Sequence, residues 1–438
     1  MKNLIALVFA CISCLCAISA PAADITIPAL DIPISLSGFG TIGFAGSDQS
    51  YNYQRFVNKD GTFKRDSVMG VQMDARLSSE FSMTLQAKVA PSLSSDKDVD
   101  VSLSWAFLSW RPTNDWLIRV GRLRVPLYLN SENMDVGTTF DFARLPAEVY
   151  TTAQTTDGDG IFVSKTWNME VNEVTLVGYV GTTETSYRAY RRDNAPSLSL
   201  SYGSYFEQVR VDSSGLVLTL TRGDNIFRMS VHDTYIQSTG NQLMPETYPY
   251  VSLRSDLGYY QTSNLMPGPG VPSKKEIHSL VYTLGADVEV GYGFRIMGEY
   301  VFRNVLDIST GMDSMAGYLA VLKSFGRWTP YISVARLQTM PRTRDLYNNV
   351  NGNRVPEYDA TAAQINALQR AGADGILAFD QTTVALGTSY RINPTNKIKM
   401  EWARTKTGDM SSFIDAPPGG ESGGQVINVF SLSYNVVF

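Results

Sequence analysis

Serine, histidine and aspartate, the residue types of nucleophilic catalysis, occur together at Ser230, His232 and Asp233. Such catalysis needs a base within hydrogen-bond reach of the serine and a third group that orients the base. In a strand, Ser230 and His232 share one face about 6–7 Å apart, while Asp233 points to the other face. The sequence has no lipase-type Gly-x-Ser-x-Gly turn. We therefore expect His232 to be a structural residue that lines the interior of the fold, and we expect the protein not to be an enzyme. An enzyme is the rival class.

Signals for metals and cofactors are weak. Asp157-Gly-Asp-Gly160 matches half of a calcium loop but lacks the closing glutamate, so it predicts a simple turn. No dinucleotide, P-loop or zinc-protease motif is present. The formal charge of −5 becomes about −6 once Lys2 is removed with the leader described below, which argues against a nucleic-acid partner. We expect no cofactor and no metal.

Residues 1–22 have the parts of a signal peptide. Lys2 supplies the positive charge, Leu4–Ile18 is an apolar run, and Ala20-Pro-Ala22 offers small residues for cleavage. The run is too short for a spanning helix, and no later stretch reaches 18 consecutive apolar residues. The only cysteines, Cys11, Cys14 and Cys16, lie in this leader. The mature part, 23–438, is expected to be exported, free of disulfides and undivided by any linker.

Alternation of apolar and polar residues dominates the rest of the chain. Ser67–Leu77 and Phe81–Val89 follow period 2 almost throughout and are separated by Ser-Ser-Glu, which predicts a β-hairpin. With these two, the candidate strands number about 16. The others are Ser35–Ala45, Val99–Trp110, Trp116–Val125, Ile161–Trp167, Val171–Val180, Leu216–Thr221, Ile226–Ile236, Ser279–Val290, Phe294–Arg303, Ser314–Phe325, Trp328–Leu337, Phe379–Ile392, Lys397–Thr405 and Gln425–Phe438.

The connections between these strands form two sets. The tight ones carry Gly, Asn and Pro at turn positions and lie at 112–115, 222–225, 291–293 and 393–396. The long ones span about 48–64, 126–158, 181–213, 237–276, 339–377 and 409–424. Within one long loop, Asp359–Ala371 predicts a short helix with Asp359 as its N-cap. Tight turns at one rim and long loops at the other are typical of an outer-membrane β-barrel.

The last strand, Gln425–Phe438, shows the pattern most clearly. Alternate residues form a wholly apolar and aromatic face: Phe430, Leu432, Tyr434, Val436 and Phe438. The other face is mostly small and polar. A strand with lipid outside and water inside has this composition; the alternative is a strand of a secreted β-sandwich. Trp105, Trp116, Trp328 and Trp402 share the parity of their strands' apolar faces, which predicts an interfacial girdle or, alternatively, core aromatics.

These features together resemble the Gram-negative porins of about 16 strands. The resemblance rests on the signal peptide, the terminal Phe438 strand, the alternating hairpins and a long loop after the fifth strand. Locally, Trp105–Trp110, Gly121–Pro126 and Ser131–Asp135 are similar to porin-like proteins of proteobacteria. The resemblance implies an all-β transmembrane barrel with short periplasmic turns and long extracellular loops.

The resemblance also implies a function and partners. We expect passive diffusion of small hydrophilic solutes and ions across the outer membrane; the alternatives are a substrate-preferring channel, for example for anions, and a surface adhesin with a closed pore. The expected partners are membrane lipid, lipopolysaccharide and two further copies in a homotrimer, with Gly38 and Gly40 as a candidate contact. The barrel-assembly machinery would read Phe438, Val436 and Tyr434.

In porins, the loop at 126–158 folds into the barrel and narrows the pore. Here the loop-side residues are mostly acidic: Glu132, Asp135, Asp141, Arg144 and Glu148. The expected wall-side residues are basic: Arg76, Lys88, Arg119, Arg228, Arg295 and Arg303. Acids facing cations across an opening predict a transverse field and weak ion selectivity; the alternative is a solvated surface. Arg122 and Arg124 share the lipid-facing parity of Trp116, so either the strand has ended there or a bulge at Gly121 shifts its phase.

Overall fold

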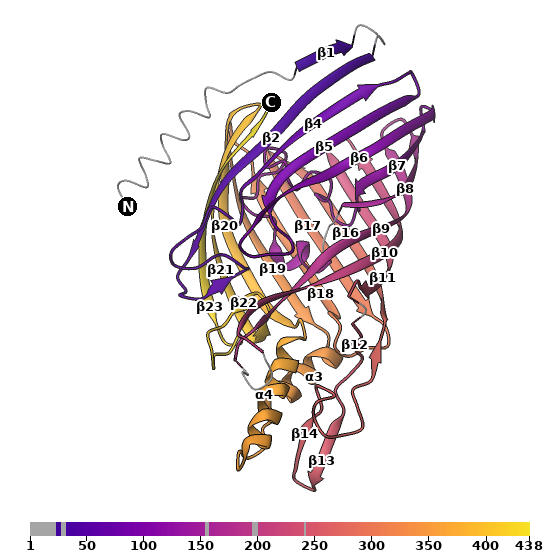
Figure 1. Ribbon diagram of the computed structural model, residues 1–438. Coiled ribbons are helices and arrows are strands. Elements are labelled where there is room, and N and C mark those ends of the chain that lie inside the picture. The colour runs from indigo at the N-terminus through magenta and orange to yellow at the C-terminus, as the bar shows by residue number, and fades with distance from the viewer. Residues whose placement is uncertain (1–22, 28–31, 154–156, 195–199, 241) are drawn as a thin grey trace.

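The alternating segments form an antiparallel sheet that closes on itself, as the computed structural model in Figure 1 shows. The structure describes residues 23–27, 32–153, 157–194, 200–240 and 242–438, so the predicted signal peptide lies outside the described residues. The described sheet has seventeen strands, of which β1 (Ala23–Ile27) pairs only with β2. The other sixteen form the barrel.

The barrel strands follow one another in chain order around the ring. They are β2 (Ile32–Ser47), β4 (Val68–Arg76), β5 (Phe81–Pro91), β6 (Val99–Thr113), β7 (Trp116–Arg124), β8 (Asp157–Asn168), β9 (Glu173–Arg191), β10 (Gly203–Arg222), β11 (Asn225–Ser238), β16 (Glu276–Gly291), β17 (Phe294–Val305), β18 (Ser314–Lys323), β19 (Trp328–Thr339), β20 (Phe379–Asn393), β21 (Asn396–Ser411) and β23 (Val426–Val437). β23 closes the ring against β2, from Phe39↔Val437 to Ser47↔Val429. Closure pairs the backbone without free edges, as a strand in lipid requires.

The terminal residue contributes directly to this seam. Gly38 and Phe438 exchange backbone hydrogen bonds of 2.7 and 3.0 Å. The Phe438 ring lies so close to Gly38 that an added Cβ would come within 2.4 Å of it. Gly38 is therefore a seat for Phe438 and is not open to a neighbouring subunit. On the same strand, Phe430 is exposed on the outer face, whereas Ser431 and Ser433 are buried on the inner face, as the alternation predicts.

The connections number fifteen, and they alternate between turns and loops L1 to L8. The loops are L1 (48–67), L2 (92–98), L3 (125–156), L4 (192–202), L5 (239–275), L6 (306–313), L7 (340–378) and L8 (412–425). The long loop expected at 181–213 is wrong, because β9 and β10 pair without a break from Thr221↔Glu173 to Gly203↔Arg191. Glu184 and Arg210 are paired across these two strands at exposed positions. The hydrogen-bonded pairing of β9 with β10 therefore continues where the apolar alternation has stopped.

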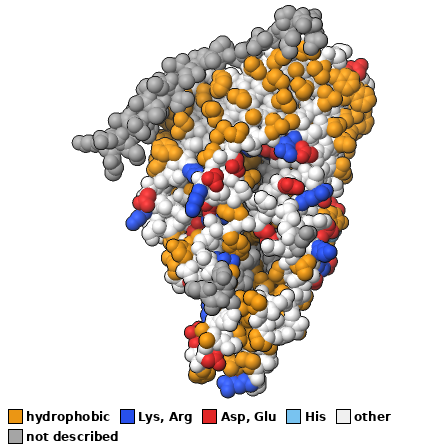
Figure 2. All heavy atoms as spheres, viewed as in Figure 1, with side chains coloured by type: hydrophobic (Ala, Val, Ile, Leu, Met, Phe, Trp, Pro, Cys, Tyr) orange, Lys and Arg blue, Asp and Glu red, His pale blue; other side chains and the backbone are white. Residues whose placement is uncertain are grey.

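The apolar band covers the part of the barrel near the short turns, and charged side chains lie farther toward the loops (Figure 2). Stacked aromatic pairs mark the turn rim, such as Phe81 with Trp110 at 6.1 Å. The expectation that Trp105 shares the outer face is wrong. A bulge places Trp105 opposite Gln86, a buried residue of the inner face. The extra residue, Ser104, shifts the phase of β6, and period 2 alone does not reveal such a shift.

Helices occur only in the loops of the described chain. The predicted helix is present as α4 (Ala360–Asp374), whose N-cap Asp359 accepts a hydrogen bond from the Ala362 amide at 2.8 Å. L7 also contains α3 (Pro341–Gly352), which the sequence analysis missed although Pro341 stands at its first position. L3 contains the single turn α2 (Ala147–Tyr150). None of these described helices has the length and apolar composition needed to cross a membrane.

Candidate functional site

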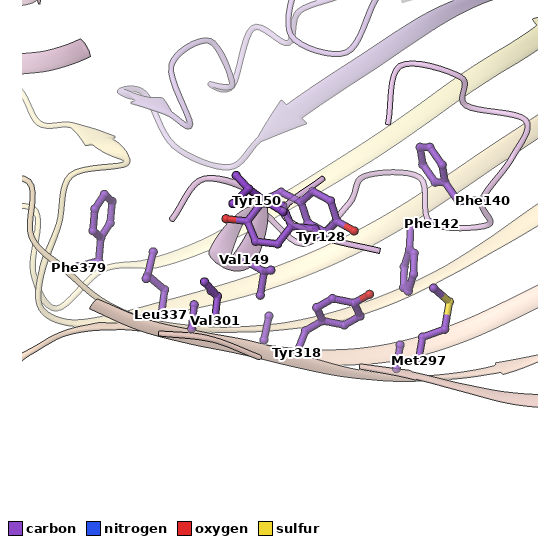
Figure 3. Close-up of a cluster of buried hydrophobic side chains, with 14 of the residues drawn as sticks. Tyr128, Phe140, Phe142, Val149, Tyr150, Met297, Val301, Tyr318, Leu337 and Phe379 are labelled. Carbon is purple, nitrogen blue, oxygen red and sulfur yellow. The ribbon is translucent and has the colours of Figure 1, made fainter. Parts of the chain in front are cut away.

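L3 folds into the barrel and packs on the inner faces of β16 to β20. Val149 of the loop points toward Val301 of the wall, and Phe142 packs edge-on against Tyr318, with ring centroids 5.9 Å apart (Figure 3). In this sector β18 is apolar on both faces: Ala316, Ala320 and Leu322 are buried, and Leu319 and Val321 are exposed. Burial of these side chains replaces contact with water, which contributes about 1.5–3 kcal/mol for each large residue. The sector is therefore a core and not a water-filled wall.

A buried carboxylate anchors the loop at the centre of this core. Glu299 of β17 accepts hydrogen bonds from the Leu129 amide (2.8 Å), the Tyr150 hydroxyl (2.7 Å) and the Tyr318 hydroxyl (3.0 Å). Two of these donors belong to L3. Since a buried charge without partners is costly, the carboxylate selects the loop position that satisfies it.

Wall cations hold the backbone of L3 in the same way. Four wall cations donate hydrogen bonds to loop carbonyls: Arg228 to that of Tyr128 (2.7 Å), Arg303 to that of Thr152 (3.0 Å), Lys397 to that of Phe140 (3.2 Å) and Lys399 to that of Phe142 (2.9 Å). Lys399 also lies 3.7 Å from the centroid of the Phe140 ring. Arg228 and Arg303, expected to line an open pore wall, thus satisfy the irregular backbone of an inserted loop.

Three of the predicted loop-side acids are paired or buried. Asp135 accepts from Lys88 and Arg124, both at 2.8 Å, and Arg124 also binds Asp157 at 2.7 Å. Burial alone would raise the pKa of Asp135, but the charges of Arg124 and Lys88 outweigh it and lower the pKa to about 2. Asp135 and its partners therefore form a closed charge cluster at the start of L3.

Asp141 and Glu148 meet different parts of the wall. Asp141 accepts from Ser389 (2.7 Å) and Lys397 (3.0 Å), with Arg295 at 4.0 Å. Burial raises its pKa, but the Lys397 charge and these hydrogen bonds lower it overall. Glu148 is 2% exposed and accepts from Gln381 at 2.7 Å. Asp141 is thus already paired with cations of the wall, and Glu148 is bound to a neutral amide.

The remaining predicted site residues lie apart from this core. Glu132 is exposed and 3.8 Å from Arg119. Arg295 pairs mainly with Asp287 of its neighbouring strand. Arg76 is exposed beside the turn at 77–80 and has no ion pair among the described residues. The arrangement is a set of local pairs, and it differs from the two opposed charged rows that the sequence suggested.

L1 also folds inward and meets L3. Tyr53 and Val57 of L1 are buried against Ile427 and Val429 on the inner face of β23. Arg144 of L3 crosses to L1, with its Nε 3.3 Å from an Asp66 carboxylate oxygen and a hydrogen bond to Gln54 at 2.9 Å. Sequence analysis missed L1 as a partner of L3, because neither loop has a periodic pattern that reports where it packs.

The two arginines of ambiguous phase separate at the end of β7. Arg122 remains on the outer face and pairs with the exposed Asp159 at 2.7 Å. Gly121 has φ of +130°, yet the pairing with β8 continues in regular register past it. Arg124, the last residue of β7, turns inward under L3. The strand therefore continues through both arginines without a shift of register against β8, so neither of the two explanations considered above holds.

Ser230 and His232 do contact each other, contrary to the expectation from strand spacing. The His232 Nε2 lies 2.7 Å from the Ser230 hydroxyl, and its Nδ1 lies 2.7 Å from the Tyr179 hydroxyl. His232 is 0% exposed, and no carboxylate belongs to this chain of contacts among the described residues. Asp233 points outward to His278 at 2.5 Å. The two side chains point to the same face of β11 and approach each other where L3 covers them. The arrangement is a buried hydrogen-bonded chain that links β9 to β11.

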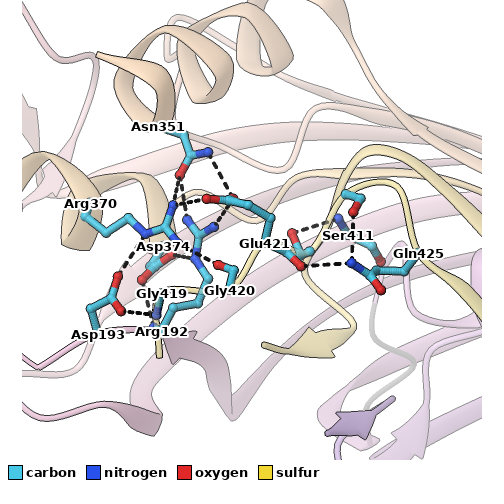
Figure 4. Close-up of polar contacts among 12 residues, drawn as sticks. Arg192, Asp193, Asn351, Arg370, Asp374, Ser411, Gly419, Gly420, Glu421 and Gln425 are labelled. Carbon is cyan, nitrogen blue, oxygen red and sulfur yellow. Dashed lines mark hydrogen bonds and ion pairs between the residues drawn. The ribbon is translucent and has the colours of Figure 1, made fainter. Parts of the chain in front are cut away.

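At the loop rim, an ion-pair network ties three loops together (Figure 4). Arg192 of L4 binds Asp374 of α4 (2.5 Å) and Glu421 of L8 (2.7 Å). Arg370 of α4 binds Glu421 (2.5 Å) and Asp193 of L4 (3.0 Å). Both arginines are buried, so the network holds α4 over the rim. Ile365 and Leu368 of α4 are buried against Tyr259 and Met266 of L5.

Space remains on both sides of L3. The outer cavity, about 450 Å³, lies between L3, the strands β9 to β11 and the loops L7 and L8. The inner cavity, about 340 Å³, lies between L1, L3 and the strands β19 to β23. A third space of about 240 Å³ lies beside Arg119, Glu132 and Arg228. No cluster of three or more His, Cys, Asp or Glu suited to a metal occurs in the described parts of the chain.

A closed ring of sixteen strands with a lipid-facing apolar band, tight turns at one rim and an inserted third loop defines the outer-membrane porin fold. The chain is accordingly an outer-membrane β-barrel. No family model and no curated protein sequence matches it.

Solved structures are similar in fold. A loop-deletion variant of OmpT, an outer membrane protein of Vibrio cholerae, has a TM-score of 0.50 and 11% identity, covering 93% of this chain and 99% of that one. OprB of Pseudomonas putida has a TM-score of 0.50 and 10% identity, covering 93% and 94%. The outer membrane channel DcaP of Acinetobacter baumannii has a TM-score of 0.48 and 12% identity, covering 95% and 100%. Identities this low establish the barrel alone.

Proposed function

We propose that this protein is a channel for passive diffusion of small hydrophilic solutes and ions across the outer membrane. The observation that carries the proposal is the pair of cavities that flank L3 inside a closed barrel. The fold is similar to that of OprB of Pseudomonas putida, at a TM-score of 0.50.

An enzyme is disfavoured by the geometry of Ser230 and His232. Their contact is buried beneath L3, and the group that holds the other nitrogen is the Tyr179 hydroxyl. A nucleophile must reach its substrate, and this serine is only 9% exposed. The adhesin alternative assigns function to L4, L7 and L8 alone and leaves the two cavities without a role.

A substrate-preferring channel is the second candidate, and one observation favours it. The charged side chains that line the outer cavity are Arg55, Arg65, Arg188 and Arg303, and no acid lines it among the described residues. Positive lining raises the local concentration of anions in a narrow, weakly screened space.

The proposal also covers how the barrel is inserted into the outer membrane and how copies of it associate. Phe438, Val436 and Tyr434 serve as the signal read by the barrel-assembly machinery, and Phe438 then seals the seam on Gly38. We propose a homotrimer in contact with lipid and lipopolysaccharide, with a contact other than Gly38. Deletion of Phe438 is expected to lower the amount of heat-modifiable protein in outer membranes without blocking export.

The decisive experiment is conductance of the purified protein in a planar lipid bilayer. A channel predicts stepwise, ohmic currents in potassium chloride. Silence over a range of voltages, with protein shown to be folded by its heat-modifiable mobility, would contradict the proposal and favour the adhesin.

A further inference from the structure

The two cavities meet at a neck between L1 and L3. Five residues line both spaces: Gln54, Arg65, Met134, Tyr150 and Thr151. Two of them come from L1 and three from L3. Arg65 is the one charged residue of the five. Any solute that moves from the outer to the inner cavity along this side of L3 passes this side chain.

Arg65 differs from the other charged residues around it. Its Nε is buried without a hydrogen-bond partner, and no ion pair within 4 Å involves it in the described chain. The neighbouring cations are engaged: Arg144 with Asp66 at 3.3 Å, and Arg188 with Asp415 at 2.7 Å. Burial and then the neighbouring Arg144 lower the pKa of Arg65 to about 10, so the guanidinium stays charged at neutral pH. A partly buried charge without a partner favours an anion beside it.

The nearest acid, Asp66, adjoins Arg65 in the sequence and acts on it electrostatically, but its ion pair within 4 Å is with Arg144. The other acids of the inner cavity have partners elsewhere: Asp135 binds Lys88 and Arg124, Glu148 binds Gln381, and Glu401 binds Tyr331. The outer cavity adds three more arginines to the lining, of which Arg55 and Arg188 are paired with Asp96 behind it. Arg65 is therefore the charge at the neck that has no ion pair among the described residues.

The rest of the outer cavity is mainly apolar. Its lining includes Leu93, Tyr179, Ile236, Leu377 and Phe413. Hydrated inorganic ions gain nothing from such surfaces, whereas an organic body buries area against them. A volume of about 450 Å³ lies within the range of cavities that hold small molecules.

We propose that the outer cavity and the neck bind an organic carboxylate with an aromatic or aliphatic body, whose carboxylate contacts the guanidinium of Arg65. The inference rests on the proposed channel function and names the substrate class of that channel. Arg65 is the specificity-determining residue, because a planar guanidinium with free N–H groups matches a carboxylate with two parallel hydrogen bonds. The apolar lining of the outer cavity favours ligands with an aromatic or aliphatic body, and Arg65 at the neck favours ligands with a negative charge.

The test measures block of the ion current by sodium benzoate in planar bilayers. The controls are acetate, which lacks the apolar body, and benzyl alcohol, which lacks the charge. We expect benzoate to half-block the current at a concentration at least tenfold below that of acetate, and benzyl alcohol to leave the current unchanged. Equal block by acetate, or block by benzyl alcohol, would overturn the assignment of substrate class.

Variants locate the site. Arg65→Gln is expected to raise the half-blocking concentration of benzoate at least tenfold, and Arg65→Lys less, because lysine keeps the charge without the fork. Arg76→Gln removes the same charge far from the neck and is expected to leave the block unchanged. Leu93→Ser, at a side chain 55% exposed, is expected to weaken block by benzoate and not by acetate. Unchanged block in folded Arg65→Gln protein would refute the role of Arg65.

Failure of this inference differs from failure of the channel. A wild-type protein that conducts but shows no benzoate block refutes the binding site alone. A folded protein without conductance refutes the channel, and calorimetric titration of benzoate into the detergent-purified protein then decides the binding site by itself: heat that is lost in Arg65→Gln supports it, and no heat in either protein overturns it.

Discussion

L3 and L1 both fold into the barrel, but their charges are used in opposite ways. L3 is rich in acids, and Asp135, Asp141 and Glu148 all have partners in the wall. L1 contributes Arg65, which has no hydrogen-bond or ion-pair partner among the described residues and lines two cavities. The number of charges in a segment thus says little about how many remain available to a solute. Charges that hold a loop in place are already satisfied, and the unpartnered charge is the one that can bind.

The largest effect is expected where a paired charge of L3 is removed. Asp135→Ala leaves Lys88 and Arg124 with Asp157 as their one shared carboxylate, and breaking a buried pair costs up to about 3–5 kcal/mol. We expect a lower midpoint of guanidinium-induced unfolding in detergent and a larger, noisier conductance as L3 leaves its seat. Glu132→Ala, at an exposed residue 3.8 Å from Arg119, is the matched control and should cost less than about 1 kcal/mol. Equal effects of the two variants would remove the distinction between seated and exposed acids.

A smaller effect is expected from a cation that holds the loop backbone. Arg303→Met removes the hydrogen bond to the Thr152 carbonyl but keeps much of the apolar stem. Hydrogen bonds from charged groups contribute about 1.5–3 kcal/mol. The expected result is a destabilised L3, seen as faster proteolysis within 125–153 in detergent. Arg76→Met, which has no such bond, serves as the control, and identical proteolysis rates in both variants would contradict the anchoring role.

The pH dependence tests the same cluster. Asp135 has a folded pKa of about 2, below the ordinary value of 3.8, so its charge pairs stabilise the loop above pH 3.8 and are lost as the pH falls toward 2. The difference corresponds to about 2 kcal/mol. We expect constant single-channel conductance from pH 7 to about pH 4 and a change between about pH 4 and pH 2. A transition centred near pH 5 would show that another group controls L3.

The smallest effect concerns ion selectivity. Exposed charges are screened over about 8 Å at physiological salt. Joint Arg76→Gln and Arg119→Gln substitution should therefore leave the reversal potential in a potassium chloride gradient within a few millivolts, whereas Arg65→Gln should shift it toward cations. A larger shift from the double variant than from Arg65→Gln would place the selective charge on the wall and contradict the role of Arg65.

Much of the barrel follows from local alternation. The hairpin of β4 and β5, the seam strand β23 and the turns at 222–225 and 393–396 were all predicted, because lipid on one side and water on the other act on each residue separately. The same reasoning failed at Trp105, where one extra residue reverses the phase. It also failed at 181–213, where strands continue outside the apolar band.

The candidate site was predicted only in its location. That a long loop follows the fifth strand is visible in the sequence, and so is its acidic content. The partners of the loop residues are not visible in the sequence. Arg144 pairs with Asp66 of another loop, and Glu148 binds Gln381, which lies more than 230 positions away from it in the chain. No periodicity connects such residues, since their meeting depends on where an irregular loop settles against a curved wall.

The sequence by itself therefore determined the strands, their faces, the turn rim and the loop rim, because each of these is set by a residue and its near neighbours in contact with lipid or water. Only the tertiary structure decided which charged side chains are paired with another residue and which remain available to a solute. Arg65 and Asp135 look alike as charged loop residues, yet one is left at a neck between two cavities and the other is closed between two cations. The physical reason is that ion pairing acts over a few ångströms in space, and closing the barrel is what brings L1, L3 and the wall within that distance.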